Sequence, residues 1–535
     1  MSDPLELEQL FGPDSNHIDE SMYDKVEYVE LYDNQNGNYA TGQVAFNTDS
    51  QMKHHIVYSD SYFTLPIRAV TSTPGRLAVK NSILSFIQGL SIESGSGTII
   101  ANEQLSTPII ANMRLLLDSS IDYIEGNELM YFGQDKTVEE DASGAQMSVV
   151  GGAHGDVSMG SGVVAQALDF RYNPKLCNRI TVLANREYVT VAAAGPPVVE
   201  HTRTFVAYIP LKFIHDFFAQ MNFPMINMSL RITFNIAGVG SYTGFSPWTT
   251  PTFPAHLSSG SIAAPAALKV NAVAAGIAVP DDPIAGTLAP AVPTAVVGTT
   301  EVVGSFKDRF GGAHAPRLFL KTVYFRAAEA AALKAKIVSG FQKQLTYRVS
   351  NYYLRSYVAN SLSSGVDWPF VQGIIRPSRL WVFPLEYDGA GVPALKSTMN
   401  TFPSRIGKLA LRNTNIVLNG DQFYNNMFKT QYDYYREFKT QLIGAGTSQA
   451  ATTPVSYSDW ISGFNPYCFD LSRNATVRTN NLCTLALNTE LIDQTTGQPA
   501  ITPVDLYVVV ERLQVVTLKV SEGGVEVLVK QGASE

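Results

Sequence analysis

The chain has 535 residues, more than one hydrophobic core usually supports, so we expect two or more domains. Hydrophobic residues make up 45% and charged residues only 16%, below the usual charged share of roughly a quarter, which suits a protein whose surface is largely covered by partners. The net charge of −8 gives no electrostatic reason to bind nucleic acid over a wide face, so no direct sequence-specific nucleic-acid binding is expected.

The first 40 residues are predicted to form an acidic N-terminal arm. Residues 1–34 hold ten acidic side chains and a single basic one, Lys25. Such a segment is either solvated and mobile or ordered only by lying along a neighbouring subunit. The start has no basic and apolar leader, so we expect no secretory signal and synthesis inside a cell. No run of some 18 strongly apolar residues predicts a membrane span.

Residues 41–326 are predicted to form a first β-rich unit. Recurring β-branched and aromatic residues predict its strands, which we place at 55–58, 62–67, 83–100 (two strands around the Gly95–Gly97 turn), 180–189, 204–209, 228–234 and 317–325. Two short helices are expected, at 109–117 after the helix-opening Pro108 and at 212–221.

Residues 237–316 are predicted to be a long excursion between two strands of this first unit. Ala, Gly, Pro, Ser and Thr dominate 237–300, where the charged residues are Lys269, Asp281 and Asp282. The segment has too few large apolar side chains for a core of its own and is too long for an ordinary connection. We expect subunit contacts to order it, on the outer surface of an assembly or between adjacent subunits.

An alanine-rich helix is predicted at 327–341, and Gly340 suits the position just after a helix end. Because this helix lies between the two β-rich units, we expect it to connect them. The second unit, 342–535, has strand signals at 344–353, 378–385, 409–418, 467–471, 483–487, 505–520 and 525–529. Helical signals are sparse throughout, so the chain is expected to be mostly β.

Two internal echoes suggest that one unit is used twice. The first echo begins with a strand that ends in Pro-Leu, at 208–211 and again at 382–385. In each case a second segment follows, at 223–234 and at 402–418. Residues 317–325 are echoed by 505–510. Neither echo is an identity, but their order predicts a β-sandwich repeated in tandem.

No pattern for catalysis, phosphate binding or metal binding stands out. Residues 151–156 hold glycines without the lysine of a phosphate loop. His54 and His55 would point to opposite faces of a strand, and His201 and His215 lack partners at ligand spacing. We therefore expect no catalytic, cofactor-binding or metal-binding residues, no cofactor, and a protein that is not an enzyme.

The cysteines and aromatic residues have ordinary structural interpretations. Three scattered cysteines predict buried reduced thiols rather than a disulfide framework, namely Cys177, Cys468 and Cys483. The aromatic cluster at 432–438 suits core packing or a subunit interface, although a sugar or base platform is an alternative.

A family resemblance is carried by the order of eight segments: 62–67, 83–93, 109–117, 208–211, 223–234, 317–325, 344–353 and 504–510. Over roughly residues 40–535 the chain resembles the double jelly-roll major capsid proteins of double-stranded DNA viruses, and is most similar to those of virophages and polinton-like viruses. The resemblance implies an all-β fold of two tandem eight-stranded jelly-roll β-sandwiches, with a few short helices and long loop insertions.

The same resemblance implies a structural major capsid protein, located in the virion and assembled inside the host cell. It would form homotrimers, pseudo-hexameric capsomers that tile an icosahedral shell around a double-stranded DNA genome. The implied partners are neighbouring capsomers, penton proteins and minor capsid proteins. Two alternatives stay open: a β-sandwich protein that binds or hydrolyses glycans with residues such as Trp368 and Trp381, and a minor capsid or vertex protein.

Overall fold

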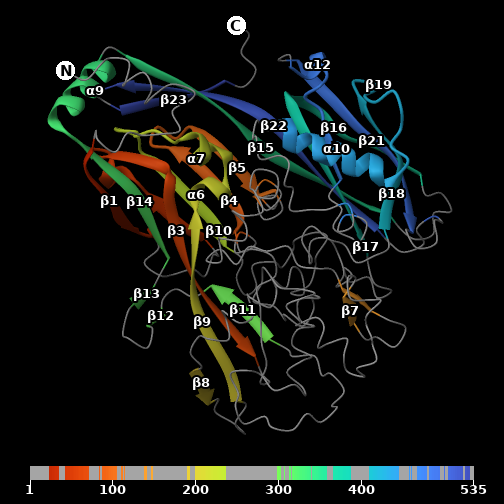
Figure 1. The fold of residues 1–535 in the computed structure, drawn as a ribbon, viewed down its shortest axis with the longest axis horizontal. Coiled ribbons are helices and arrows are strands. Elements are labelled where there is room, and N and C mark those ends of the chain that lie inside the picture. Colours follow the sequence, from red (N-terminus) through yellow and green to blue (C-terminus); the bar gives the residue numbers. More distant parts are fainter. Residues whose placement is uncertain are drawn as a thin grey trace.

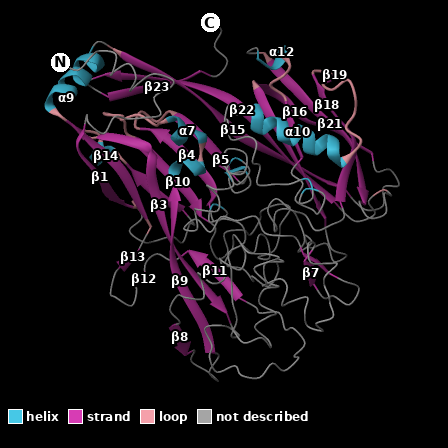
Figure 2. Cartoon of the chain, viewed as in Figure 1, coloured by secondary structure: helices cyan, strands magenta, loops and turns pink. Residues whose placement is uncertain are grey.

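The computed structural model describes residues 23–34, 43–71, 84, 87–104, 110, 111, 114, 138–140, 146–148, 189–192, 199–236, 298–302, 306–307, 313–314, 316–338, 340–357, 365–386, 409–444, 457, 460, 467–478, 481–493, 499, 504–521 and 524–530. Strands dominate this part of the chain, and the helices between them are few (Figures 1 and 2). The paired strands are antiparallel throughout, so the all-β prediction is confirmed.

The first half of the chain forms two facing sheets. One sheet has the order β1 (Tyr23–Tyr32), β14 (Arg317–Phe325), β3 (His55–Thr71) and β9 (Val199–Pro210). The other has the order β2 (Gln43–Asn47), β10 (Leu230–Ile236), β4 (Ile87–Ser94) and β5 (Ile99–Gln104). Counted along the chain, these eight strands are arranged 1-8-3-6 and 2-7-4-5, which is a jelly roll. The first sheet is extended by β8 (Val189–Ala192) and β11 (Gly298–Val302).

The second half repeats this arrangement. One sheet has the order β15 (Phe341–Tyr357), β22 (Val504–Ser521), β17 (Pro377–Glu386) and β20 (Tyr467–Asp470). The facing sheet has the order β16 (Gly365–Ile375), β21 (Leu482–Asp493), β18 (Leu409–Leu418) and β19 (Asp421–Gln422). Counted along the chain, the order is again 1-8-3-6 and 2-7-4-5. The prediction of two tandem eight-stranded jelly rolls is therefore confirmed.

The smaller elements complete the described chain: β6 (Val138–Glu140) with β7 (Gln146–Ser148), β12 (Phe306–Lys307) with β13 (Ala313–His314), β23 (Gly524–Lys530) beside β22, a 3-10 turn at Asp49–Gln51, and the helices α6 (Leu211–Ile214), α7 (Asp216–Gln220), α9 (Ala327–Val338), α10 (Gln431–Gly444) and α12 (Ala475–Arg478). Helix α9 lies in the chain between the last strand of the first jelly roll and the first strand of the second, as predicted.

Each jelly roll closes over its own aromatic core. In the first, Phe63 of one sheet stacks on Phe234 of the other, with ring centroids 4.6 Å apart. In the second, Tyr353 approaches Phe370 across the two sheets, at 5.6 Å. Alternation places these side chains inside, because successive residues of a strand point to opposite faces.

The predicted acidic arm is wrong for residues 23–34. Tyr23–Tyr32 is β1, the first strand of the first jelly roll, and it pairs with β14 along its length. Leu31 reaches the core, whereas acidic residues occupy exposed positions, where Glu30 accepts from Arg317 and Glu27 accepts from the Tyr324 hydroxyl. The acidic composition of this segment therefore reflects the solvent-facing positions of an edge strand and does not indicate a separate arm. Residues 1–22 lie outside the described part of the chain.

One of the two echoes is also wrong. Residues 208–211 end the sixth strand of the first jelly roll, but 382–385 belong to the third strand of the second. The true counterpart of β17 is β3, because both are third strands of their jelly rolls. The second echo holds, because β14 and β22 are both eighth strands. The repeat was inferred correctly, on one correct correspondence and one incorrect one.

The helices show two further differences from the predictions. The helix expected at 212–221 is two helices, α6 and α7, separated by His215, which has an extended backbone and whose Nδ1 accepts from the Phe217 amide. Helix α10 was not predicted, nor was strand β16, whose Pro369 interrupts the register. At 109–117, the described residues Ile110, Ala111 and Arg114 are helical, in agreement with the prediction.

The excursion does lie between two strands of the first jelly roll, the seventh (β10) and the eighth (β14). Part of it, β11, pairs with β3 and so belongs to the first sheet. Its segment 237–297 lies outside the described residues. The same is true of the loop at 151–156, of Cys177 and of the strand expected at 180–189 except Val189.

Candidate functional site

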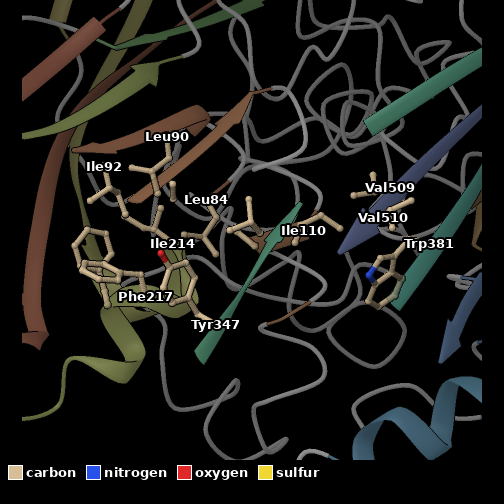
Figure 3. Close-up of a cluster of buried hydrophobic side chains, with 14 of the residues drawn as sticks. Leu84, Leu90, Ile92, Ile110, Ile214, Phe217, Tyr347, Trp381, Val509 and Val510 are labelled. Carbon is tan, nitrogen blue, oxygen red and sulfur yellow. The ribbon is translucent and has the colours of Figure 1, made fainter. Parts of the chain in front are cut away.

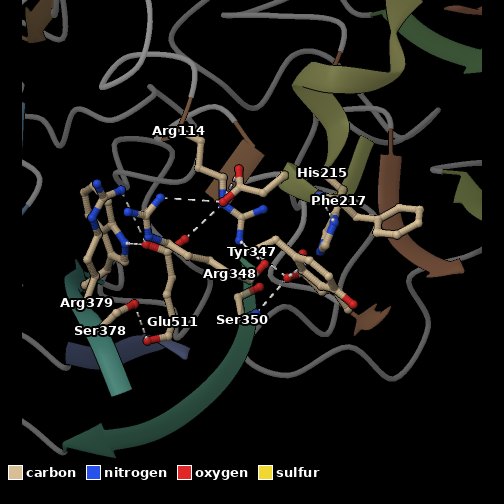
Figure 4. A network of polar contacts seen from close by, with 12 residues as sticks. Arg114, His215, Phe217, Tyr347, Arg348, Ser350, Ser378, Arg379 and Glu511 are labelled. Atoms are coloured by element: carbon tan, nitrogen blue, oxygen red, sulfur yellow. Dashed lines mark hydrogen bonds and ion pairs between the residues drawn. The ribbon is translucent and has the colours of Figure 1, made fainter. Parts of the chain in front are cut away.

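The two jelly rolls meet at a buried polar junction, shown in Figure 4. The first jelly roll contributes strand β5, the segment that carries Arg114, and the His215–α7 corner. The second contributes strands β15, β17 and β22. Because all these groups are polar and shielded from water, each needs a partner with good geometry to offset its lost hydration.

Arg114 and Glu511 form the centre of this junction. The Arg114 Nε donates to Glu511 Oε1 at 2.9 Å, and its Nη2 donates to the Arg348 carbonyl oxygen at 3.2 Å. Glu511 is fully buried, and its second oxygen accepts from the Trp381 Nε1 at 3.0 Å. Burial alone would raise the pKa of Glu511, but the guanidinium groups of Arg114 and Arg379 hold it below its ordinary value.

Glu103 of β5 forms the second part of the junction. Its Oε1 accepts from the Ser350 amide of β15 at 2.7 Å and lies 3.4 Å from the His215 Nε2. The His215 Nδ1 accepts a backbone hydrogen bond from Phe217, so the ring carries its proton on Nε2, the nitrogen that faces Glu103. Burial opposes ionisation of Glu103, yet the nearby Arg114 and His215 keep its pKa below the ordinary value.

Two more contacts connect the jelly rolls at this level. Asp216, the first residue of α7, lies 3.6 Å from Arg348 and 3.8 Å from Arg114, and both cations lower its pKa against the effect of burial. The carbonyl oxygen of Ile100 in β5 accepts from both the Tyr347 hydroxyl and the Gln514 side chain, each at 2.8 Å. Strand β5 is thus hydrogen-bonded to both β15 and β22 of the other jelly roll.

Apolar side chains continue the contact on either side of these polar groups (Figure 3). Phe217 packs edge-on against Tyr347, with ring centroids 5.5 Å apart. A single buried cluster runs through both jelly rolls and includes Leu84, Leu90, Ile92, Ile110, Ile214, Trp381, Val509 and Val510. The two jelly rolls are therefore joined as one block, since repacking either side would expose apolar area.

The junction is suited to fixing geometry, not to chemistry. Its carboxyl groups Glu103, Asp216 and Glu511 are opposed by the guanidinium groups of Arg114, Arg348 and Arg379. All three carboxyl pKa values are lowered, so each group is a carboxylate at neutral pH and none is tuned as a proton donor. Removing one member would leave an uncompensated buried charge, which costs about 3–5 kcal/mol.

Sequence reasoning did not select Glu103, Arg114 or Glu511. The available signal was a single charge inside an apolar run: Glu511 follows a run of valines in β22, and Arg114 lies in the apolar helical segment at 109–117. Such a charge is costly to bury alone, so it indicates a partner elsewhere in the fold. Nothing in the sequence states which partner, because 397 positions separate these two residues.

The residues that the sequence did single out are not brought together. Trp368 and Trp381 are both buried and belong to facing sheets of the second jelly roll. In the aromatic cluster, Tyr434 and Phe438 pack in the core while Tyr432 is exposed on α10. Cys468 and Cys483 are buried free thiols, as predicted. His55 begins β3, and burial, with His54 beside it, lowers its pKa to about 4.

Within the ranges given above, no set of three His, Cys, Asp or Glu side chains is arranged to hold a metal ion. No helix in the described part of the chain is both long and apolar enough to cross a membrane.

Comparison with known proteins gives structural similarity alone. No protein-family model matches the chain, and no curated protein does. A chain in the cryo-EM structure of the Sputnik virophage is similar in structure, with 12% sequence identity, a TM-score of 0.53 and coverage of 97% of this chain and 91% of that one. A chain in the PBCV-1 virus capsid gives 10% identity, a TM-score of 0.43, and coverage of 96% and 98%. This protein is therefore a double jelly roll, with a fold similar to that of the virophage chain over nearly its whole length.

Proposed function

We propose that this protein is a structural major capsid protein. Three copies would form a pseudo-hexameric capsomer of six jelly rolls, and these capsomers would tile an icosahedral shell around a double-stranded DNA genome. The proposed location is the virion, after synthesis and assembly inside the host cell. The proposed partners are neighbouring capsomers, penton proteins and minor capsid proteins.

One observation carries the proposal: the same strand order occurs twice, and a buried, charge-balanced junction holds the two copies together. A jelly roll buries the inner faces of its two sheets against each other, so it folds as a unit that can pack beside another. A block that tiles a lattice needs a fixed angle between its two jelly rolls, because a deviation of that angle in each block would accumulate across the shell. The proposal is also supported by the fold that this chain shares, over 97% of its length, with a chain in the structure of the Sputnik virophage.

The test is the mass and shape of the purified chain. Light scattering coupled to size-exclusion chromatography should give three times 58.3 kDa, about 175 kDa, and electron microscopy should show particles of six lobes. A chain that stays monomeric up to high micromolar concentration would contradict the proposal. Copy number separates a major capsid protein from a minor or vertex protein, because the major protein should dominate a gel of purified virions.

The glycan-binding alternative gains no support from the described residues. Its two named tryptophans are buried, and the Trp381 indole is already hydrogen-bonded to Glu511. A sugar platform needs an exposed aromatic face, so neither side chain can form one without unfolding its strand.

A further inference from the structure

The outer face of the first jelly roll carries a row of aromatic side chains whose two ends are exposed. The row crosses four strands of the β1-β14-β3-β9 sheet in the order Tyr28, Phe319, Tyr62 and Tyr208. Tyr62 lies at its centre, with ring centroids 4.8 Å from Phe319, 5.4 Å from Tyr28 and 5.9 Å from Tyr208. Tyr28 is 49% exposed and Tyr208 41% exposed.

These side chains point outward because their neighbours point inward. Phe63, next to Tyr62, stacks on Phe234 inside the jelly roll. Phe319 is the register partner of Tyr62 and therefore shares its face. Two ion pairs lie on the same sheet: Arg317 with Glu30 at 2.9 Å and Lys321 with Asp60 at 2.6 Å. An exposed apolar patch with a charged rim is typical of a protein contact surface.

The second jelly roll has an aromatic row at the corresponding place, and there only Tyr352, at the edge of the row, is exposed, at 37%. It runs from Tyr352 on the first strand through Tyr507 on the eighth to Phe383 and Trp381 on the third. Phe383, Trp381 and Tyr507 are at most 1% exposed. Arg114 of the first jelly roll approaches this same face, since Glu511 lies on the outer side of β22 together with Tyr507.

The junction within the chain is thus an asymmetric contact between two different sides of a jelly roll. We call the outer face with the aromatic row the sheet side. We call the fifth strand, together with the helical segments that follow the fifth and sixth strands, the helix side. The first jelly roll uses its helix side, namely β5, the Arg114 segment and α7, and the second uses its sheet side. Among the described residues, no contact like this junction covers the sheet side of the first jelly roll or the helix side of the second.

We infer that the sheet side of the first jelly roll binds the helix side of the second jelly roll of another copy. By position, that helix side comprises β19, α10 and α12. It exposes Tyr432 and Met427 for apolar contact, and Lys429 and Arg436 are exposed cations on or beside α10. Strand β1, at the edge of the sheet side, exposes Asp24, while its Glu30 is already paired with Arg317. The two surfaces therefore match in apolar character.

The geometry of this contact leads to a ring. Because two different surfaces meet, each copy contacts one neighbour through one free side and a second neighbour through the other. Such head-to-tail contacts produce either a closed ring or a filament that extends indefinitely. Three copies close it with alternating contacts within and between chains. The inference rests on the proposed function and goes beyond it by naming the residues of the intersubunit contact.

The first experiment uses the Tyr28→Glu/Tyr208→Glu double variant of the full chain, with Leu482→Glu as control. Leu482 is 68% exposed at the start of β21, on neither of the two sides. Loss of two aromatic anchors should raise the concentration at which the trimer dissociates about 100-fold or more, measured by mass photometry, while the control should behave as wild type. Circular dichroism checks that both variants are folded.

A second experiment removes the dependence on a folded double variant. The photo-reactive amino acid benzoylphenylalanine replaces Tyr28 alone, and mass spectrometry locates the cross-link. Adducts within residues 421–444 or 475–478 of another copy are expected. Adducts only elsewhere, or a trimer unaffected by the double variant, would overturn the assigned surface and leave the capsid function standing. A monomeric wild-type chain would overturn the proposed function itself.

Discussion

Arg114 and Glu511 form an ion pair 2.9 Å long that joins the two jelly rolls, and both side chains are almost fully closed off from solvent. Neither jelly roll can form this pair alone, since Arg114 belongs to the first and Glu511 to the eighth strand of the second. The pair therefore forms only when the two halves are correctly placed, and its stability reports on their docking.

Glu511→Gln should destabilise the protein by about 3 kcal/mol, because it keeps the shape of the side chain but leaves Arg114 and Arg379 less compensated in a buried site. The matched control is Glu490→Gln, which breaks the Arg412 pair of the same 2.9 Å length at a partly exposed site. That control should lose less than about 1 kcal/mol. Denaturant unfolding followed by tryptophan fluorescence measures both, and equal losses would contradict the special cost of the buried pair.

Acidification should weaken the junction. Glu103, Asp216 and Glu511 all have folded pKa values below their ordinary 4.5, 3.8 and 4.5. Below about pH 5 the unfolded chain therefore takes up protons that the folded protein does not, so the free energy of unfolding falls as the pH falls. Unfolding measured between pH 5 and pH 3 should show a smaller pH slope in Glu511→Gln than in wild type. Identical slopes would mean that Glu511 is not held ionised by its neighbours.

His55 should make a separate contribution at milder pH. Its folded pKa of about 4 lies below the ordinary 6.5, chiefly because it is buried. Between those values the unfolded state binds the extra proton, so stability should fall by up to roughly 3 kcal/mol as the pH drops from 6.5 to 4. His55→Phe should remove most of that decline and preserve the ring contact with Phe325. His54→Gln is the control that keeps His55, and it should retain the decline.

Deleting residues 237–297, which spares strand β11, should leave both jelly rolls folded but weaken the trimer. The expectation follows from composition, since this segment has few large apolar side chains with which to support a core. Thermal unfolding and mass photometry of the deletion variant test it. An unchanged melting temperature together with an unchanged trimer would rule out the bracing role.

Most strands were predictable because alternation is a local property of the sequence. Strands β14 and β18 were placed with their true bounds, and β22 to within one residue at each end. Strand β1 was missed because its exposed acidic residues dominate the composition, although Val29 and Leu31 alternate with them. Helix α10 was missed because its aromatic residues, such as Tyr434 and Phe438, resemble strand composition more than helix composition.

Pairing was the part that local patterns predicted least well. The Pro-Leu echo joined a sixth strand to a third one, because proline near a strand end recurs wherever the ladder ends. The partners of the buried charges were also not predictable. The sequence shows that Glu511 interrupts an apolar run, but its partner Arg114 is 397 positions away and comes near it only in the folded chain.

The amino-acid order of this chain thus specifies its strands, its repetition and its lack of a recognisable catalytic motif, because each of these depends on residues near one another in sequence. Which sheet side is covered and which is exposed depends on how two nearly equivalent jelly rolls dock. The aromatic rows headed by Tyr28 and Tyr352 look alike as sequence. Packing against the other jelly roll buries Trp381 and Tyr507 in the second row, while Tyr28 and Tyr208 in the first remain in contact with solvent.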